Sequence, residues 1–277
     1  MFYQQVCDII LPPNSFGREN PFSNRGEFFK MKIRFLGTNG WYNTHIANTT
    51  CIFIETGEFY LVLDAGDGFY KVGRFIKQRK PIYLFLSHFH LDHISGLHTL
   101  NKFTFPQGLK IYGYKGMSRI LNRVICSPYT VPFSELSYPV ELLEIEEGRH
   151  NSPFPFTSLF LLHSVACFGY RLEIEGKTIA YCPDTGVCEN ALRLSENADL
   201  LLCECSLRTG EFKEEWPHLN PHTAAQIAQR SKAKQLILIH FNPYLYPELA
   251  DREEASRRAR EVFANVFYAQ DEQEVEV

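Results

Sequence analysis

The stretch from residue 88 to residue 93 carries four side chains that can bind a metal: His88, His90, Asp92 and His93. It follows closely on the apolar run 81–86, which has the length and composition of a strand buried on both faces. Imidazole nitrogen and carboxylate oxygen are ligands that zinc, manganese and iron accept. Scattered surface histidines would not show this spacing on a strand-to-helix turn. The stretch therefore predicts a metal site.

The elements around this motif must hold it at the edge of a sheet. Residues 92–100 carry Asp and Ser near their start and apolar residues at Ile94, Leu97 and Leu100, which predicts a helix that begins at the motif. Open α/β sheets place their sites at the carboxyl ends of interior strands, where these ligands would lie.

Three further candidate ligands stand just past apolar runs: His163, Asp184 and His240. A single polar residue at a strand end is more often structural. Three of them in a chain that already carries the motif favour one common site. Seven ligands suit two metal ions, with the Asp184 carboxylate shared between them.

Composition is typical of a globular enzyme. The 277 residues suffice for a large core, and the net charge of −4 marks neither a nucleic-acid-binding nor a membrane-surface protein. The eight cysteines form no CxxC pair, which indicates reduced thiols and a cytoplasmic location. No apolar run approaches the roughly 18 residues that a membrane span needs, so no membrane association is expected.

The domain organisation follows from where the turn-forming residues gather. Residues 1–30 are punctuated by Pro, Gly and Asn, and a fresh alternating strand begins after Met31. We therefore expect an N-terminal extension over 1–30 and a single domain over 31–277. Strands are predicted at 32–38, 49–55, 59–64, 81–86, 109–114, 140–146, 156–163, 168–173, 177–182, 200–206, 235–240 and 266–269, and helices at 69–80, 92–100, 115–124, 222–229 and 248–263. The basic face of the helix at 69–80 is interpreted as solvated rather than bound to a phosphate backbone.

The order of the candidate ligands resembles the five motifs of the metallo-β-lactamase superfamily, over essentially residues 31–270. Phe35 to Thr38, Gly169 to Leu172 and Asp184 to Gly186 are similar to its phosphodiesterase branch, typified by ribonuclease Z and the cyclic phosphodiesterases. The resemblance implies an α/β fold, an αββα sandwich with a dinuclear metal site at one edge. Zinc is expected, with manganese and iron as alternatives. The implied ligands are His88, His90 and His163 for one ion, Asp92, His93 and His240 for the other, and Asp184 for both.

The same resemblance suggests a proton donor. The segment around Glu204 resembles the Glu-Ala-Thr segment of ribonuclease Z, and His218-Leu219-Asn220 resembles its His-Ser-Thr segment. In that family the Glu orients the His, which can protonate the leaving oxygen. Glu204 and His218 would take these roles here, while Asp92 would orient the attacking water. His222 is a competitor for the acid, and His218 is favoured over it.

One departure from ribonuclease Z bears on the substrate. The bacterial enzyme carries a long Gly/Pro-rich arm that clamps tRNA between its third and fourth motifs, whereas His163 and Asp184 are only 21 positions apart here. That interval has room for a hairpin and nothing more. We therefore expect hydrolysis of small or cyclic phosphodiesters by metal-activated water, with nucleic acid not favoured as a partner.

Three alternatives remain open. The first is a ribonuclease Z-type endonuclease that processes tRNA 3′ ends, for which a homodimer could assemble the missing basic surface. The second is a lactone or thioester hydrolase that keeps the metals. The third is a metal-binding scaffold protein without catalysis. A complete ligand set argues against this last alternative, because a decayed site should have lost at least one ligand.

Overall fold

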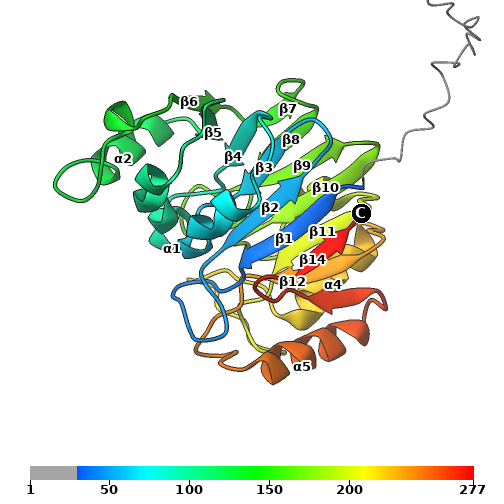
Figure 1. The fold of residues 1–277 in the computed structure, drawn as a ribbon. Coiled ribbons are helices and arrows are strands. Elements are labelled where there is room, and N and C mark those ends of the chain that lie inside the picture. The colour runs from blue at the N-terminus through cyan, green and yellow to red at the C-terminus, as the bar shows by residue number, and fades with distance from the viewer. Residues whose placement is uncertain (1–29) are drawn as a thin grey trace, which may run out of the picture.

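The computed structural model describes residues 30–277, and it has the predicted αββα architecture (Figure 1). Two seven-stranded sheets lie face to face. Helices cover the outer face of each, with α4 (Pro221–Arg230) and α5 (Leu249–Arg260) against one sheet and α1 (Leu91–Ile94) and α2 (Met117–Val124) against the other. None of the helices within 30–277 has the length and apolar character that a bilayer crossing requires.

The first sheet has the strand order β14-β1-β2-β3-β4-β5-β6. Neighbours from β3 to β6 are parallel, while β1 pairs antiparallel with β2 and β14. Its strands are β1 (Lys32–Gly37), β2 (Cys51–Glu55), β3 (Tyr60–Leu63), β4 (Ile82–Phe85), β5 (Leu109–Tyr114), β6 (Val140–Ile145) and β14 (Glu274–Glu276).

The second sheet has the order β13-β12-β11-β10-β9-β8-β7, with β10 to β13 parallel. Its strands are β7 (Gly148–His150), β8 (Phe156–Phe160), β9 (Phe168–Ile174), β10 (Lys177–Cys182), β11 (Leu200–Glu204), β12 (Leu236–Ile239) and β13 (Val266–Tyr268). The hairpin of β9 and β10 fills the interval between His163 and Asp184, as the short spacing predicts.

The sandwich has three apolar layers because both faces of each sheet are covered. In β2, Ile52 and Ile54 point into the core between the sheets, whereas Cys51 and Phe53 pack under the outer helices. This two-sided burial explains why the interior strands read as continuous apolar runs rather than as alternating ones.

The outer helices are short. Against the first sheet lie η1 (Asp67–Arg74), α1 (Leu91–Ile94), η2 (Ser95–Lys102), α2 (Met117–Val124) and η3 (Phe133–Glu135), and against the second lie α3 (Glu189–Ser195), α4 (Pro221–Arg230) and α5 (Leu249–Arg260). Helix α4 begins at a capping box in which Asn220 and Thr223 exchange hydrogen bonds, with Pro221 at the first helical position. This start fixes the chain that precedes it, which carries His218.

The helix predicted at 69–80 is wrong in extent. The structure has a 3₁₀ helix that ends at Arg74, because the backbone N–H groups of Lys77 and Gln78 donate to the Tyr60 hydroxyl instead of to a helical turn. Its basic side chains are also partly engaged. Lys71 is buried and pairs with Asp271 at 2.9 Å.

Two other expectations need correction. The strand predicted to reach His163 ends at Phe160, so His163 lies in the following loop, and the helix predicted at 92–100 is divided into α1 and the 3₁₀ helix η2. The expected extension over 1–30 falls, apart from Lys30, outside the described residues. The single domain over 31–277 stays a prediction.

Candidate metal centre and active site

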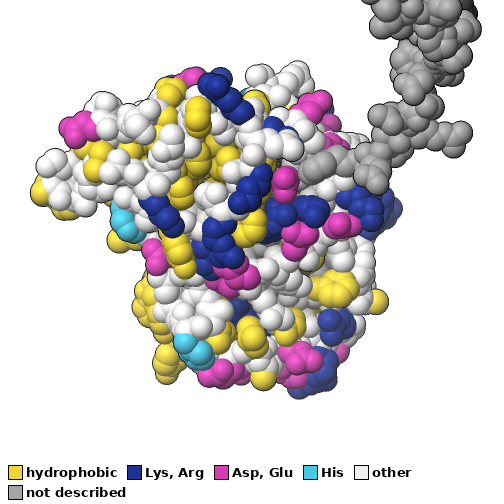
Figure 2. All heavy atoms as spheres, viewed as in Figure 1, with side chains coloured by type: hydrophobic (Ala, Val, Ile, Leu, Met, Phe, Trp, Pro, Cys, Tyr) yellow, Lys and Arg dark blue, Asp and Glu magenta, His cyan; other side chains and the backbone are white. Residues whose placement is uncertain are grey.

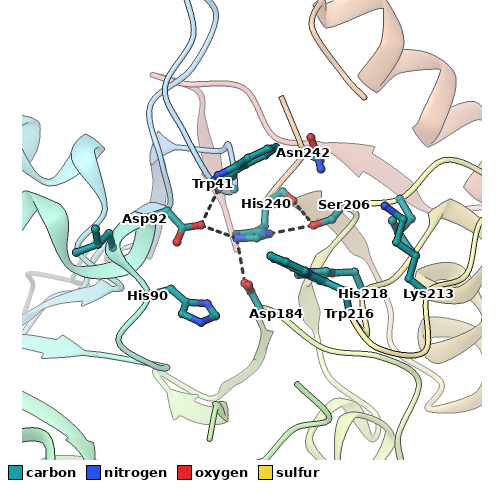
Figure 3. Close-up of a pocket in the computed structure, with 13 residues that line it drawn as sticks. Trp41, His90, Asp92, Asp184, Ser206, Lys213, Trp216, His218, His240 and Asn242 are labelled. Carbon is teal, nitrogen blue, oxygen red and sulfur yellow. Dashed lines mark hydrogen bonds and ion pairs between the residues drawn. The ribbon is translucent and has the colours of Figure 1, made fainter. Parts of the chain in front are cut away.

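The seven predicted ligands lie together where the carboxyl ends of parallel strands from both sheets meet. His88 follows β4, Asp184 follows β10 and His240 follows β12, so three strand ends bring together residues that are far apart in the sequence. Figure 3 shows His90, Asp92, Asp184 and His240 around the floor of one pocket.

The first group consists of His88, His90, His163 and Asp184, whose ligand atoms all lie within 4.8 Å of one another. His90 Nδ1 is 3.0 Å from His88 Nε2 and 3.4 Å from His163 Nε2. Asp184 Oδ2 lies 3.8 Å from His88 Nε2 and 3.7 Å from His163 Nε2. Four ligand atoms therefore face one point.

The second group consists of Asp92, His93 and His240, and Asp184 joins it through its other oxygen. Asp184 Oδ1 is 3.2 Å from His93 Nε2 and 3.0 Å from His240 Nε2, and these two nitrogens are 3.1 Å apart. Asp92 Oδ2 lies 3.4 Å from His240 Nε2. Asp184 thus stands between the groups with one oxygen directed at each.

This geometry fits divalent metal ions. Ligands in a tetrahedral shell at about 2.0–2.1 Å from zinc stand about 3.3 Å apart, close to the separations within both groups. Asp184 Oδ1 is buried and, within residues 30–277, accepts no hydrogen bond of acceptable geometry, although two imidazole nitrogens lie beside it. A buried carboxylate oxygen in that state is suited to bind a cation.

Three of the histidines have their ring orientation fixed from behind. His93 Nδ1 donates to Asp64 Oδ2 at 2.8 Å. Ser87 Oγ donates to that same oxygen, so it accepts from His88 Nδ1 at 3.0 Å. Ser206 Oγ donates to the His240 carbonyl and therefore accepts from His240 Nδ1 at 3.1 Å. Each arrangement leaves Nε2 as the nitrogen that faces the site, with the hydrogen bond at Nδ1 that typically orients a metal-binding histidine.

Asp64 is the residue that sequence reasoning missed. The sequence predicts it only as the last residue of the strand at 59–64, yet it is fully buried directly after β3 and its carboxylate lies behind His93. Its φ of 54° places it in the left-handed region that Asp tolerates better than most residues. An Asp just past a buried strand was the available signal, the same one that singled out Asp184.

The histidines fall into two classes, those with a lowered pKa and those with a raised pKa. Burial lowers the pKa of His88 well below its ordinary value and that of His163 to about 4. Burial acts in the same direction on His93 and His240, but the Asp184 and Asp92 carboxylates outweigh it. They raise the pKa of both residues, to about 10 for His240. A metal ion entering the second group would replace protons held between histidines and carboxylates.

The nearby histidines in turn shift the pKa values of the Asp184 and Asp92 carboxylates. Burial disfavours the charged form of Asp184, but His240 and His93 hold its pKa well below the usual range. The same holds for Asp92, where His93 and His240 outweigh burial and lower the pKa. Both groups are therefore anionic at neutral pH.

The predicted proton donor also lies at this pocket. His218 Nδ1 is 2.6 Å from Glu204 Oε1, and Glu204 is fully buried. Burial lowers the pKa of His218, but the Glu204 carboxylate outweighs that effect and raises it. His222 instead lies on α4, 3.3 Å from Glu261, and does not line the pocket.

His218 is also a candidate metal ligand. With Asp184 and His240 it forms a third group of candidate ligand atoms. Its Nδ1 is engaged by Glu204, so Nε2 is the nitrogen that faces the pocket, where it accepts a hydrogen bond from the Trp216 indole N–H.

Comparison with known proteins defines the class. The model of the beta-lactamase superfamily domain matches residues 61–241, and the chain belongs to this superfamily. Ribonuclease Z of Bacillus velezensis is 26% identical over 310 aligned positions, which cover 89% of this chain and 99% of the relative.

Two solved structures share the fold. The metallo-beta-lactamase fold protein YhfI from Bacillus subtilis superposes with a TM-score of 0.75 at 23% identity, covering 90% of this chain and 99% of YhfI. A diphosphatase from the PhnP family has a TM-score of 0.68 at 18% identity and covers 89% of this chain and 98% of its own. The predictions of the superfamily, of its ribonuclease Z-like branch and of a metal-dependent hydrolase are confirmed. Membership implies divalent metal ions, for which the histidine and aspartate groups supply ligands.

Proposed function

We propose that the protein is a dinuclear metal-dependent phosphodiesterase that acts on small or cyclic phosphodiesters, with zinc as the preferred ion. The observation that carries this proposal is the pair of His218 and Glu204 beside the two ligand groups. An alkoxide leaving group needs a proton when the ester bond breaks, and a histidine held by a buried carboxylate can supply it. A thiolate leaves readily without that help, so this pair favours a phosphodiester over a thioester.

The ligand roles are part of the proposal. His88, His90 and His163 would hold one ion, and Asp92, His93 and His240 the other, with Asp184 shared. Two divalent ions bound there would make hydroxide available at neutral pH and offset the negative charge that develops on the phosphoryl oxygens.

Glu204 is fixed so that it can position the acid. Its Oε1 accepts from the Thr185 backbone N–H at 2.7 Å as well as from His218, and its Oε2 accepts from the Ser206 N–H at 3.1 Å. The imidazole therefore keeps its Nδ1 on the carboxylate and presents Nε2 to the pocket. The raised pKa favours protonated His218, which would donate from Nε2 once the Trp216 indole N–H has turned away from that nitrogen.

Asp92 has a second role in this proposal. Its Oδ2 accepts from the Trp41 backbone N–H at 2.6 Å, which fixes the carboxylate beside the second group. A carboxylate held there can accept a hydrogen bond from the attacking water and orient it towards phosphorus.

The preference for small substrates rests on charge. Arg74 pairs with Glu272 at 2.9 Å, and Lys71 is buried against Asp271, so this face offers less free positive charge than the sequence suggests. On the surface of residues 30–277 seen in Figure 2, basic and acidic side chains are interspersed rather than gathered in one basic patch. A protein that holds structured RNA usually draws most of its affinity from phosphate contacts.

Ribonuclease Z-type cleavage is the second candidate. It is favoured by the full-length match to ribonuclease Z, of which 99% is covered. A homodimer could supply the positive surface that one chain lacks. The cytoplasmic location expected from the cysteine pattern also stays a prediction.

The test uses metal-loaded protein and two diesters that differ in leaving group. His218→Ala should lower kcat on a diester with an alkoxide leaving group by about 100-fold or more. It should matter far less for bis(p-nitrophenyl) phosphate, whose leaving group departs without a proton. His222→Ala is the matched control, because His222 is a histidine on the adjoining helix that does not line the pocket.

Equal losses on both diesters would assign His218 to binding or structure instead of proton donation. Faster turnover of thioesters or lactones than of any phosphodiester would overturn the substrate class. Cleavage of precursor tRNA with a kcat/KM well above that for every small diester would establish the second candidate. Elemental analysis gives the metal and its stoichiometry, and one equivalent at saturation would reject the dinuclear proposal.

A further inference from the structure

Both tryptophans of the chain, Trp41 and Trp216, line the pocket above the ligand groups. The pocket has a volume of about 630 Å³. Their exposed fractions are 67% and 59%, unusually high for the largest aromatic side chain. In Figure 3 they lie on either side of His240. Exposed aromatic surface gathered at the mouth of a polar site indicates a ligand that covers it.

Trp41 is held in place at a cost in backbone energy. Its φ of 62° lies in the left-handed region, which a bulky residue rarely adopts. The preceding Gly40 donates its N–H to the Phe241 carbonyl at 2.9 Å, and the Trp41 N–H donates to Asp92. Gly40 packs so closely on the His240 ring that an added Cβ would overlap it. The backbone of this segment is thus fixed to the site while the indole remains exposed.

Trp216 projects from a loop that is closed at its base. The Leu207 N–H donates to the Leu219 carbonyl at 2.9 Å, and Asn220 Nδ2 donates to the Glu211 carbonyl at 3.0 Å. The Trp216 ring is nearly parallel to that of His218, at 27° and 6.2 Å between centroids. His218 is in turn nearly parallel to His240, at 17° and 6.1 Å. A flat apolar surface therefore stands directly beside the proposed acid.

We propose that Trp41 and Trp216 form the walls of a subsite for a nucleobase, so that the substrate is a nucleoside phosphodiester rather than a diester of simple alcohols. Lys213, on the same loop as Trp216, lines the pocket and adds positive charge for a nucleotide phosphate. Stacking on an aromatic side chain accepts any base, because every base has a π face. The inference rests on the proposed function for the diester, whereas the base subsite can be tested without catalysis.

The binding test uses the tryptophans as reporters. Since the chain has no other tryptophan, indole fluorescence reports on this pocket alone. Adenosine 5′-monophosphate and ribose 5-phosphate share sugar and phosphate and differ in the base. With excitation at the red edge of the indole absorption, only the former should quench the fluorescence, and W41F and W216F should show which wall responds. Equal quenching by both compounds would mean phosphate binding without a base subsite.

The kinetic test compares two five-membered cyclic diesters, adenosine 2′,3′-cyclic phosphate and glycerol 1,2-cyclic phosphate. Trp216→Leu and Trp41→Leu should lower the ratio of their kcat/KM values by about 5- to 150-fold, the equivalent of stacking worth about 1–3 kcal/mol. The loss should be mainly in KM, and Phe at either position should restore most of the ratio. Tyr129→Leu is the control, because Tyr129 is 76% exposed and lies outside the pocket.

The two proposals fail in different ways. If the base-dependent quenching is observed but neither diester is hydrolysed, the subsite stands and the proposed function fails. If both diesters are hydrolysed at a ratio that the Leu variants leave unchanged, the phosphodiesterase stands and the subsite is refuted.

Discussion

Asp64→Asn tests whether the residue behind His93 controls the metal site. Asp64 accepts four hydrogen bonds: Oδ1 from the Ser87 N–H at 2.7 Å, and Oδ2 from Ser87 Oγ at 2.7 Å, Tyr181 Oη at 2.6 Å and His93 Nδ1 at 2.8 Å. Asn has the same shape and tolerates the positive φ, so the backbone should not change. It replaces one acceptor oxygen with an NH₂ donor and removes the negative charge.

The magnitude follows from these four contacts. In its least costly orientation the amide keeps its oxygen on the three donors at Oδ2 and turns its NH₂ towards the Ser87 N–H, so that the Ser87 N–H and the new amide N–H groups are buried without an acceptor. Each such donor costs about 1–3 kcal/mol of the free energy of unfolding. His93 also loses the anionic partner that raises its basicity, and such losses typically weaken metal binding by about 10- to 100-fold.

The assay is a competition for zinc between the protein and a chromogenic chelator, together with thermal unfolding of the metal-free protein. Tyr181→Phe is the matched control, because it removes one donor from Asp64 without touching His93. It should lower stability by about 1 kcal/mol and leave zinc affinity within a few-fold of the parent. If Asp64→Asn bound zinc as tightly as the parent, the proposed support of His93 would be refuted.

Three further outcomes are expected. Because the pKa values of His93 and His240 are raised, zinc should displace protons at neutral pH and bind more weakly as pH falls. Calorimetry in buffers of different ionisation enthalpy measures the number of protons released, and a value of zero would contradict this expectation. Gly40→Ala should push the His240 ring out of place and lower activity by about 100-fold. Unchanged activity would contradict this, because it would mean that the ring moves aside without loss. Arg252→Met should lower the free energy of unfolding by about 3 kcal/mol in denaturant titrations, since the buried guanidinium donates to Thr38 and to Asn39. The control is Arg257→Met at an exposed position, which should change that free energy by less than about 0.5 kcal/mol.

Regular elements were predictable where the chain carries a strong local pattern. The strands at 109–114 and 177–182 have the predicted bounds, because their apolar residues lie between clear turn signals. The short strands β7 and β14 and the helix α3 were not predicted. β14 consists of Glu274, Val275 and Glu276 and exists through its pairing with β1. A three-residue strand with one apolar side chain has no pattern of its own to detect.

The helix predicted at 69–80 shows the opposite case. Its apolar spacing is genuinely helical, but tertiary contacts decide where the helix ends. The Tyr60 hydroxyl takes the N–H groups of Lys77 and Gln78, and Lys71 turns inward to Asp271, which lies two hundred positions further along the chain. Neither partner is visible in the local sequence.

The sequence by itself determined which residues are candidates for the metals, because ligand chemistry depends on residue type and the motif from His88 to His93 sits on one turn. The positions of His163, Asp184 and His240 after apolar runs could likewise be read from the chain. Only the tertiary structure decided what stands behind and above those ligands. Asp64 reaches His93 because β3 and β4 are parallel neighbours, and Trp41 reaches Asp92 because the loop after β1 pairs with the residue after His240. Such contacts join segments that are distant in sequence, so no local pattern encodes them and only the packing of the two sheets brings them together.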